Sequence, residues 1–197
     1  MRIILFIFSL LISFAAFSQE FVVKETGDTL FGEVKVKEGG GYKYKISVKP
    51  IGQPNFLELE ENEVKAYQIG EKGFLQSKEK AIYSFFVKKE IIGDGVPYIM
   101  FLEPLIRNQS MNLFEEVKTG YTPNGTSFVG GTSYSYSVYY SEKGGGTLRI
   151  NKFEFKKTVS NLVSDCPNLA KKIGNKGYKY NDMYNIVEEY NTTCGKK

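Results

Sequence analysis

Alternation of apolar and polar residues recurs along this chain, and this period of two constrains the fold more than any other feature. Segment 42–48 is a clear example, because apolar residues occupy every second position: Tyr42, Tyr44, Ile46 and Val48. Successive side chains of a strand point to opposite faces, so the pattern predicts a strand with one buried face. Segment 29–37 alternates in the same way, with Leu30, Gly32, Val34 and Val36 on its inner face. Glycines 39–41 between the two segments predict a hairpin.

Shorter segments bounded by Gly, Pro or Asn predict further strands at 21–24, 56–60, 64–69, 74–77, 81–87 and 111–117. Segment 81–87 is apolar on both faces, which is typical of a central strand. Segment 97–106 fits either a short helix or an extended edge. Segment 119–131 is rich in Gly, Thr, Ser and Asn, and predicts a long loop.

The strongest alternation lies in 133–140, where one face carries Tyr134, Tyr136, Val138 and Tyr140 and the other carries Ser133, Ser135, Ser137 and Tyr139. Glycines 144–146 then predict a turn into a strand at 147–151, so this region is expected to form a second, more exposed hairpin.

The period changes near Phe153. Apolar residues then recur at helical spacing, at Phe155, Val159, Leu162 and Val163. Segment 165–167 ends this helix and begins a second, with Pro167 in its first turn and Gly174 at its end. Asn181 can cap a third helix, in which an apolar stripe recurs at Met183, Ile186, Val187 and Tyr190.

These patterns together predict an α+β protein, with an antiparallel β-sheet or partly closed β-barrel followed by a short C-terminal helical unit. The predicted parts are a signal peptide at 1–18, a β-rich domain at 19–151 and a helical tail at 152–197 that packs on the β domain.

The signal peptide is predicted from a single Arg2, an apolar run over 3–14, and small residues at Ala16 and Ser18. Cleavage before Gln19 is favoured over an uncleaved anchor, because the apolar run is shorter than the roughly 20 residues that a membrane helix needs. We therefore expect a periplasmic or secreted protein with no integral membrane segment after cleavage.

Export also bears on the two cysteines, Cys166 and Cys194. In an oxidising compartment the expected state of such a pair is a disulfide. Closing a loop of about 28 residues would stabilise the fold by about 3.6 kcal/mol in the chain-entropy model. Two thiols with no histidine make a zinc site a poor alternative, so no metal and no cofactor are expected.

The composition excludes several kinds of chemistry. The chain has no histidine, which excludes Ser-His-Asp and Cys-His catalytic groups. Its net charge of +4 is too mild to indicate nucleic-acid binding, and its lysines alternate along strands instead of clustering.

Carboxylates remain as acid-base groups, and the densest cluster is Glu58, Glu60, Glu61 and Glu63. Two of them could hydrolyse a glycoside. However, Glu58 and Glu60 share an outward face, so a solvated strand edge is favoured. Asp28 is interpreted as a turn residue, because the spaced carboxylates of a calcium loop are missing around it.

The candidates for ligand binding are Tyr134, Tyr136, Tyr139 and Tyr140, because a tyrosine combines a flat apolar ring with a hydroxyl group. The competing interpretation is structural. By the alternation, Tyr134, Tyr136 and Tyr140 face the core and Tyr139 alone lies outside, and the pattern favours this second interpretation.

Three features carry a resemblance to known sequences: a signal ending in Phe17-Ser18-Gln19, a Gly-Asp-Thr-x-x-Gly segment at 27–32, and a tail containing Asp165-Cys166-Pro167 and an Ile-Val-Glu-Glu-Tyr-Asn segment at 186–191. Together they resemble small exported proteins of unknown function from Bacteroidota-type bacteria. The resemblance implies a setting in the cell envelope and supplies no catalytic residue.

The sequence thus favours an exported envelope or secreted protein that acts as a non-enzymatic binding or interaction module, with an envelope protein or a glycan as its partner. The alternative is a glycan-binding domain or a carboxylate-based, glycan-active enzyme.

Overall fold

The computed structural model describes residues 19–39, 43–70, 83–92, 96–123, 131–174 and 177–195. The predicted signal peptide at 1–18 and the predicted strand at 74–77 lie outside the described residues. The chain divides into two compact units, Met1–Lys88 and Lys89–Lys197.

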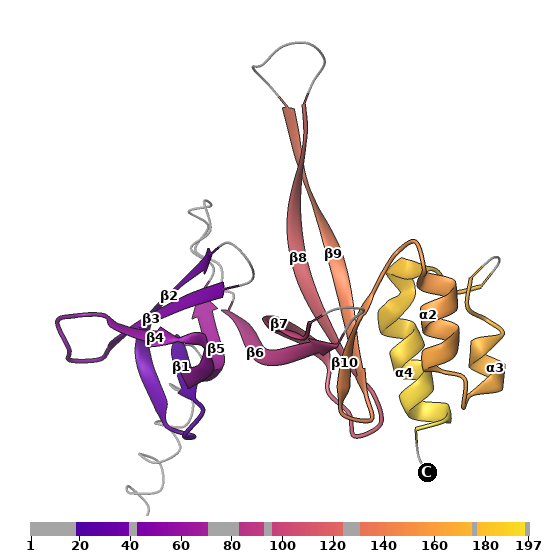
Figure 1. Ribbon diagram of the computed structural model, residues 1–197, viewed down its shortest axis with the longest axis horizontal. Helices are drawn as coiled ribbons and strands as arrows, with labels where there is room; N and C mark the ends of the chain where they lie inside the picture. The colour runs from indigo at the N-terminus through magenta and orange to yellow at the C-terminus, as the bar shows by residue number, and fades with distance from the viewer. Residues whose placement is uncertain are drawn as a thin grey trace, which may run out of the picture. The chain divides into compact units, whose positions relative to one another are not determined.

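The first unit is an antiparallel sheet in the order β6-β5-β1-β2-β3-β4 (Figure 1). Its strands are β1 (Phe21–Lys24), β2 (Thr29–Gly39), β3 (Lys43–Pro50), β4 (Leu57–Glu60), β5 (Val64–Gly70) and the first part of β6 (Tyr83–Ile92). A short 3-10 helix, η2 (Glu61–Glu63), connects β4 to β5.

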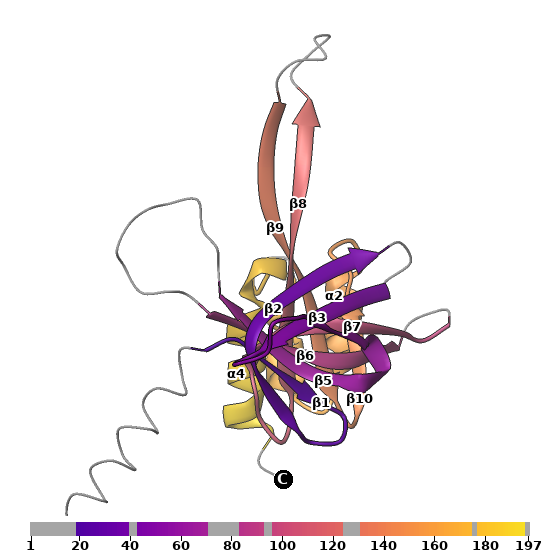
Figure 2. The ribbon, with the colours of Figure 1, turned by 90° about the vertical axis from the view of Figure 1, so that its left-hand side faces the viewer.

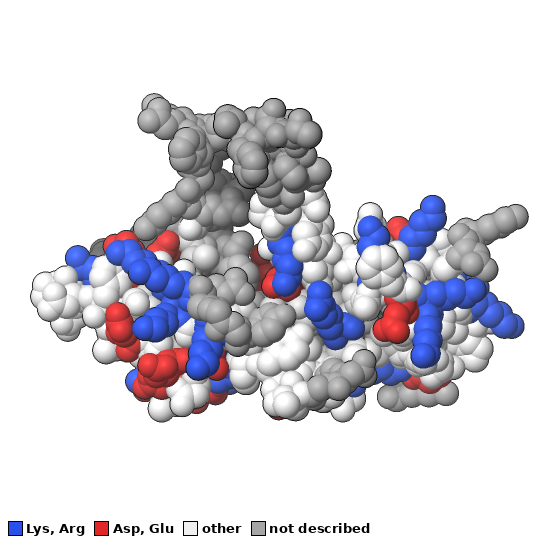
Figure 3. Space-filling model, turned by 45° about the horizontal axis from the view of Figure 1, so that its top comes forward, with Lys and Arg blue, Asp and Glu red and all other residues white. Residues whose placement is uncertain are grey.

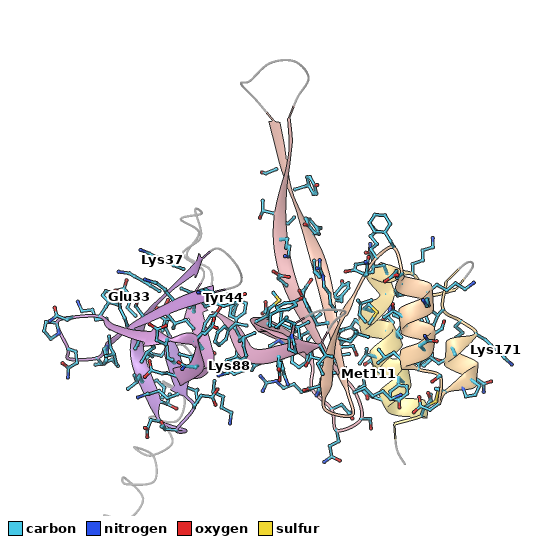
Figure 4. The ribbon with its side chains drawn as sticks, in the orientation of Figure 1. Glu33, Lys37, Tyr44, Lys88, Met111 and Lys171 are labelled. Carbon is cyan, nitrogen blue, oxygen red and sulfur yellow. A yellow bond between two sulfur atoms is a disulfide. The ribbon has the colours of Figure 1, made fainter. Side chains whose placement is uncertain are left out.

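The predicted β2–β3 hairpin is confirmed, with Val34 opposite Val48 and Lys35 opposite Ser47. Val34, Ile46 and Val48 are buried, whereas Glu33 and Lys37, labelled in Figure 4, are exposed. The alternation therefore identified the buried face of this hairpin correctly.

Gly32 is the point at which β2 changes partner. The residues before it pair with β1, and from Gly32 onward β2 pairs with β3. A Cβ at Gly32 would lie 1.9 Å from the carbonyl oxygen of Lys49, so only glycine allows the two backbones to approach this closely.

Asp28 lies in the turn between β1 and β2, as predicted. The Lys24 amide donates to the Asp28 carbonyl over 2.8 Å, and the Thr26 hydroxyl donates to the Asp28 carboxylate over 2.8 Å. Gly27 supplies the positive φ of 94° that the turn requires.

The second unit contains the rest of β6 with β7 (Tyr98–Ile106), β8 (Asn112–Pro123), β9 (Gly131–Lys143) and β10 (Gly146–Ile150), in the order β10-β9-β8-β7-β6. β10 also pairs with β6, and this pairing is parallel, with Thr147 opposite Ile91. The sheet is therefore mostly antiparallel but mixed, whereas the sequence predicted antiparallel pairing alone.

For two segments of this unit, the sequence left the secondary structure open or predicted it wrongly. Segment 97–106, for which a helix and an extended edge were both open, is strand β7 and lies between β6 and β8. The prediction of a loop at 119–131 is wrong for 119–123, which belong to β8, and for Gly131, which begins β9. Residues 124–130 of this predicted loop lie outside the described residues. The strand continues through 119–123 because these residues pair with β9. The hydrogen bonds of this pairing come from the backbone, so they form even where the side chains favour a loop.

Helices follow the sheet, as predicted: α2 (Phe155–Leu162), α3 (Pro167–Ala170), η3 (Tyr180–Asp182) and α4 (Met183–Thr193). Their buried residues include Val159, Leu169 and Ile186. These share one core with Met111, just before β8, and with Leu113 at the start of that strand. Figure 4 labels Met111 between the strands and the helices. The Asn191 side chain donates to the Met111 carbonyl over 2.9 Å and so links α4 to the sheet.

The predicted disulfide between Cys166 and Cys194 is present, with Cα atoms 5.8 Å apart. It ties the start of α3 to the end of α4. The α+β class is confirmed as a mostly antiparallel sheet with helices at its C-terminal end. In the part of the chain that the structure describes, we find no helix with the length and apolar character needed to cross a bilayer.

Candidate binding groove

Strands β8 and β9 continue beyond their neighbours as a two-stranded arm, formed by residues 117–123 and 131–137 (Figures 1 and 2). β7 pairs with β8 only up to Glu115, and β10 pairs with β9 only from Tyr139 onward. Among the described residues, neither arm strand pairs with a third strand. The arm therefore has two strand edges with unused backbone groups.

Tyr180 marks the point where the covered part of the β9 edge ends. Its hydroxyl accepts from the Tyr139 amide over 3.2 Å and donates to the Ser137 carbonyl over 3.2 Å. The Tyr180 hydroxyl is protonated at neutral pH and can donate, and burial raises its pKa further above the ordinary value of 10.0. Beyond Tyr180, the same edge carries the N–H and C=O groups of Ser135 and Ser133, because backbone groups of alternate residues point to one side.

The residues of this edge lack the usual protection against strand pairing. Segment 131–140 contains no charged residue and no proline. Natural proteins protect exposed edges with lysine, proline or bulges, so an unprotected edge is typical of a surface that another strand covers.

The candidate tyrosines divide between the core and this arm. Tyr140 is 1% exposed, and its hydroxyl donates to Glu116 over 2.8 Å. Tyr134 and Tyr136, however, are 51% and 46% exposed, so their predicted place in the core is wrong. Tyr139, predicted to lie outside, is partly buried against the ring of Tyr180 at 5.3 Å.

The physical reason is that alternation identifies the face of a strand but not what covers that face. Near Val138 and Tyr140 the face is buried, and in the arm it is open. Tyr134 covers Gly120 instead, since a Cβ on that glycine would lie 2.4 Å from the tyrosine ring.

A groove of about 1410 Å³ runs along β9, β10 and the segment that leads into α2. Its exposed apolar side chains are Ile92, Val96, Tyr136 and Phe153, and Phe153 is 98% exposed. Sequence reasoning did not identify Phe153 as a site residue. The available signal was its position, because it precedes a predicted helix but lies outside that helix's apolar stripe.

Cations dominate the charge of the groove. Arg149, Lys152 and Lys157 line it and are exposed, whereas Glu154 is the one acidic side chain along its described wall. None of the three cations forms an ion pair within the described ranges. Figure 3 likewise shows more basic than acidic side chains over the helices of this unit on the face drawn.

The glutamate cluster lies elsewhere, at the β4 edge of the first unit. Glu58, Glu60 and Glu63 are exposed. Glu63 accepts a hydrogen bond from the Glu60 amide over 2.9 Å, and Glu61 accepts from the Tyr44 amide over 3.2 Å. This is the solvated strand edge that the sequence favoured. Across the described ranges, no three His, Cys, Asp or Glu residues could hold a metal ion.

No protein-family model, curated protein or solved structure matches this chain. The functional argument therefore rests on the geometry of the fold and the groove.

Proposed function

We propose that this chain is an exported, non-enzymatic binding module of the cell envelope or the extracellular space, and that the groove beside β9 binds its partner. The observation that carries the proposal is Phe153, a fully exposed phenylalanine that lines the groove with Tyr136, beside a part of the β9 edge that no other described strand pairs with. Exposed aromatic residues beside polar ones are typical of interaction surfaces.

A binding role is also supported by what the chain offers for chemistry. The absence of histidine removes the commonest general base, and the densest carboxylate cluster lies on an open edge. Export is supported by the apolar run at 3–14 and by the disulfide in the helical tail.

The test compares two double variants in intact cells, with chemical crosslinking followed by mass spectrometry of the tagged protein. Tyr136→Ser with Phe153→Ser removes the two exposed aromatic rings of the groove. Phe31→Ser with Tyr184→Ser removes two other exposed aromatic rings, which are 41% and 49% exposed and do not line the groove. We expect the groove variant to lose its crosslinked partner by about tenfold and the control variant to keep it.

Equal crosslinking by both variants would contradict the proposal. A wild-type protein that forms no crosslinked adduct, but binds cell-wall glycan through Tyr136 and Phe153, would assign the groove to a glycan in place of a protein.

A further inference from the structure

From the β9 edge and the charges around it, we infer that the ligand of the groove is an extended acidic peptide segment of a partner protein, and that this segment adds to β9 as an extra strand. The inference rests on the proposed function and specifies the chemistry of the partner.

The backbone of β9 supplies the first part of the argument. The amide of Tyr139 and the carbonyl of Ser137 point to the β10 side, where Tyr180 satisfies them. Ser135 and Ser133 present their backbone groups along the same edge, just beyond the end of β10. A peptide that follows the line of β10 can therefore hydrogen-bond to this edge, in the recognition mode known as strand addition.

The side chains beside the edge supply the second part. Tyr136 and Phe153 offer exposed rings in the groove. An extended peptide points alternate side chains to opposite faces, so its apolar residues can contact these rings while its polar residues face solvent. Serines at 133, 135 and 137 are small and leave room beside the strand.

Charge decides which peptides fit. Arg149, Lys152 and Lys157 have no acidic partner within the described ranges, and one acidic side chain, Glu154, lies among them. An acidic peptide gains favourable Coulomb interactions with this groove, whereas a basic peptide is repelled.

The test measures fluorescence anisotropy with the purified chain, residues 19–197, and a labelled ten-residue peptide of alternating glutamate and valine. We expect saturable binding that weakens as salt is raised, and about tenfold weaker binding by the Arg149→Ser, Lys152→Ser, Lys157→Ser variant. The matched control replaces three exposed lysines outside the groove, Lys37, Lys45 and Lys171, by serine and should bind normally. A lysine–valine peptide that binds as tightly as the glutamate–valine peptide would overturn the inference.

Strand addition has its own readout, which electrostatic attraction alone would not give. Methylation of alternate backbone amides removes the donors on one edge of the peptide. We expect one of the two alternate methylation patterns to abolish binding and the other to leave it nearly unchanged. Equal effects of both patterns would contradict strand addition.

The inference and the proposed function fail in different ways. If the peptides do not bind but the Tyr136→Ser, Phe153→Ser variant still loses its crosslinked partner in cells, the inferred acidic peptide ligand is wrong and the groove remains the binding surface. If the variant keeps its partner, the proposed function itself is wrong.

Discussion

Tyr180 connects the helical tail to the edge of β9 through one hydroxyl group that both donates and accepts a hydrogen bond. Its ring also packs between Tyr139 at 5.3 Å and Phe155 at 6.1 Å. The ring and the hydroxyl therefore have separable roles, the first in packing and the second in satisfying the strand edge.

Replacing Tyr180 by phenylalanine tests this separation. We expect the free energy of unfolding to fall by about 1 kcal/mol, because the Tyr139 amide and the Ser137 carbonyl lose their partner while the ring stays packed. Urea unfolding measures the change. Tyr184→Phe, at a residue that is 49% exposed, is the control and should leave stability unchanged, so an equal loss in both variants would refute this role.

Glu142 is the second residue whose environment gives a clear prediction. Lys89 donates to its two carboxylate oxygens over 2.8 and 2.9 Å, and Asn112 donates over 2.7 Å. Burial alone would raise the pKa of Glu142, but these hydrogen bonds outweigh it and hold the pKa below the ordinary value of 4.5.

The stability from a carboxylate with a lowered pKa is present above the pKa of the unfolded state and is lost as pH falls through the pKa of the folded state. At pH 7 we expect Glu142→Gln to be less stable than the wild type by about 1 to 3 kcal/mol. Below about pH 4.5 the difference should shrink. Denaturant unfolding at several pH values measures it, and a difference that stays constant down to pH 3 would exclude this ionic contribution.

At the scale of elements, the disulfide holds together the short helices of the tail. α3 spans only Pro167–Ala170, and a helix of this length is not stable by itself. The link between Cys166 and Cys194 fixes α3 against α4, while Leu169 and Ile186 are fully buried in the core that both helices share.

Replacing both cysteines by serine should lower the free energy of unfolding by about 3.6 kcal/mol, if the constraint on the unfolded chain dominates. Chemical reduction of the wild type should cause the same loss and should not affect the variant further. A reduced wild type as stable as the oxidised protein would show that the helices pack without the link.

The sequence predicted elements well where one face of a strand or helix is buried. The β2–β3 hairpin and the stripe of α4 follow the expected alternation and helical spacing, because burial imposes these periods on the residues. The prediction failed at 119–123, where the Gly- and Thr-rich sequence favours a loop. Backbone pairing with β9 and the packing of Tyr134 over Gly120 make this segment a strand.

At the scale of the molecule, the candidate groove could be predicted only in part. The tyrosines of β9 were candidates from the sequence, and Tyr136 does line the groove. The pairing of β10 with β9 was also expected, from the turn at 144–146. No local pattern indicates, however, that 151–157, Ile92 and Tyr180 line the same groove. The parallel pairing of β10 with β6 could not be predicted from local patterns either, because it depends on contacts between segments far apart in the chain.

The central claim is that a partner lies in the groove beside β9. The most direct measurement places a photoreactive amino acid at Phe153 in one protein and at Tyr184 in another, in otherwise native chains illuminated inside the cells that export them. We predict one discrete adduct from position 153 and at most a tenth as much from position 184. The reason is that a few central residues of an interface carry most of its binding energy, so a partner in the groove stays close to position 153. Equal adducts from both positions, or an adduct from position 184 alone, would contradict the claim.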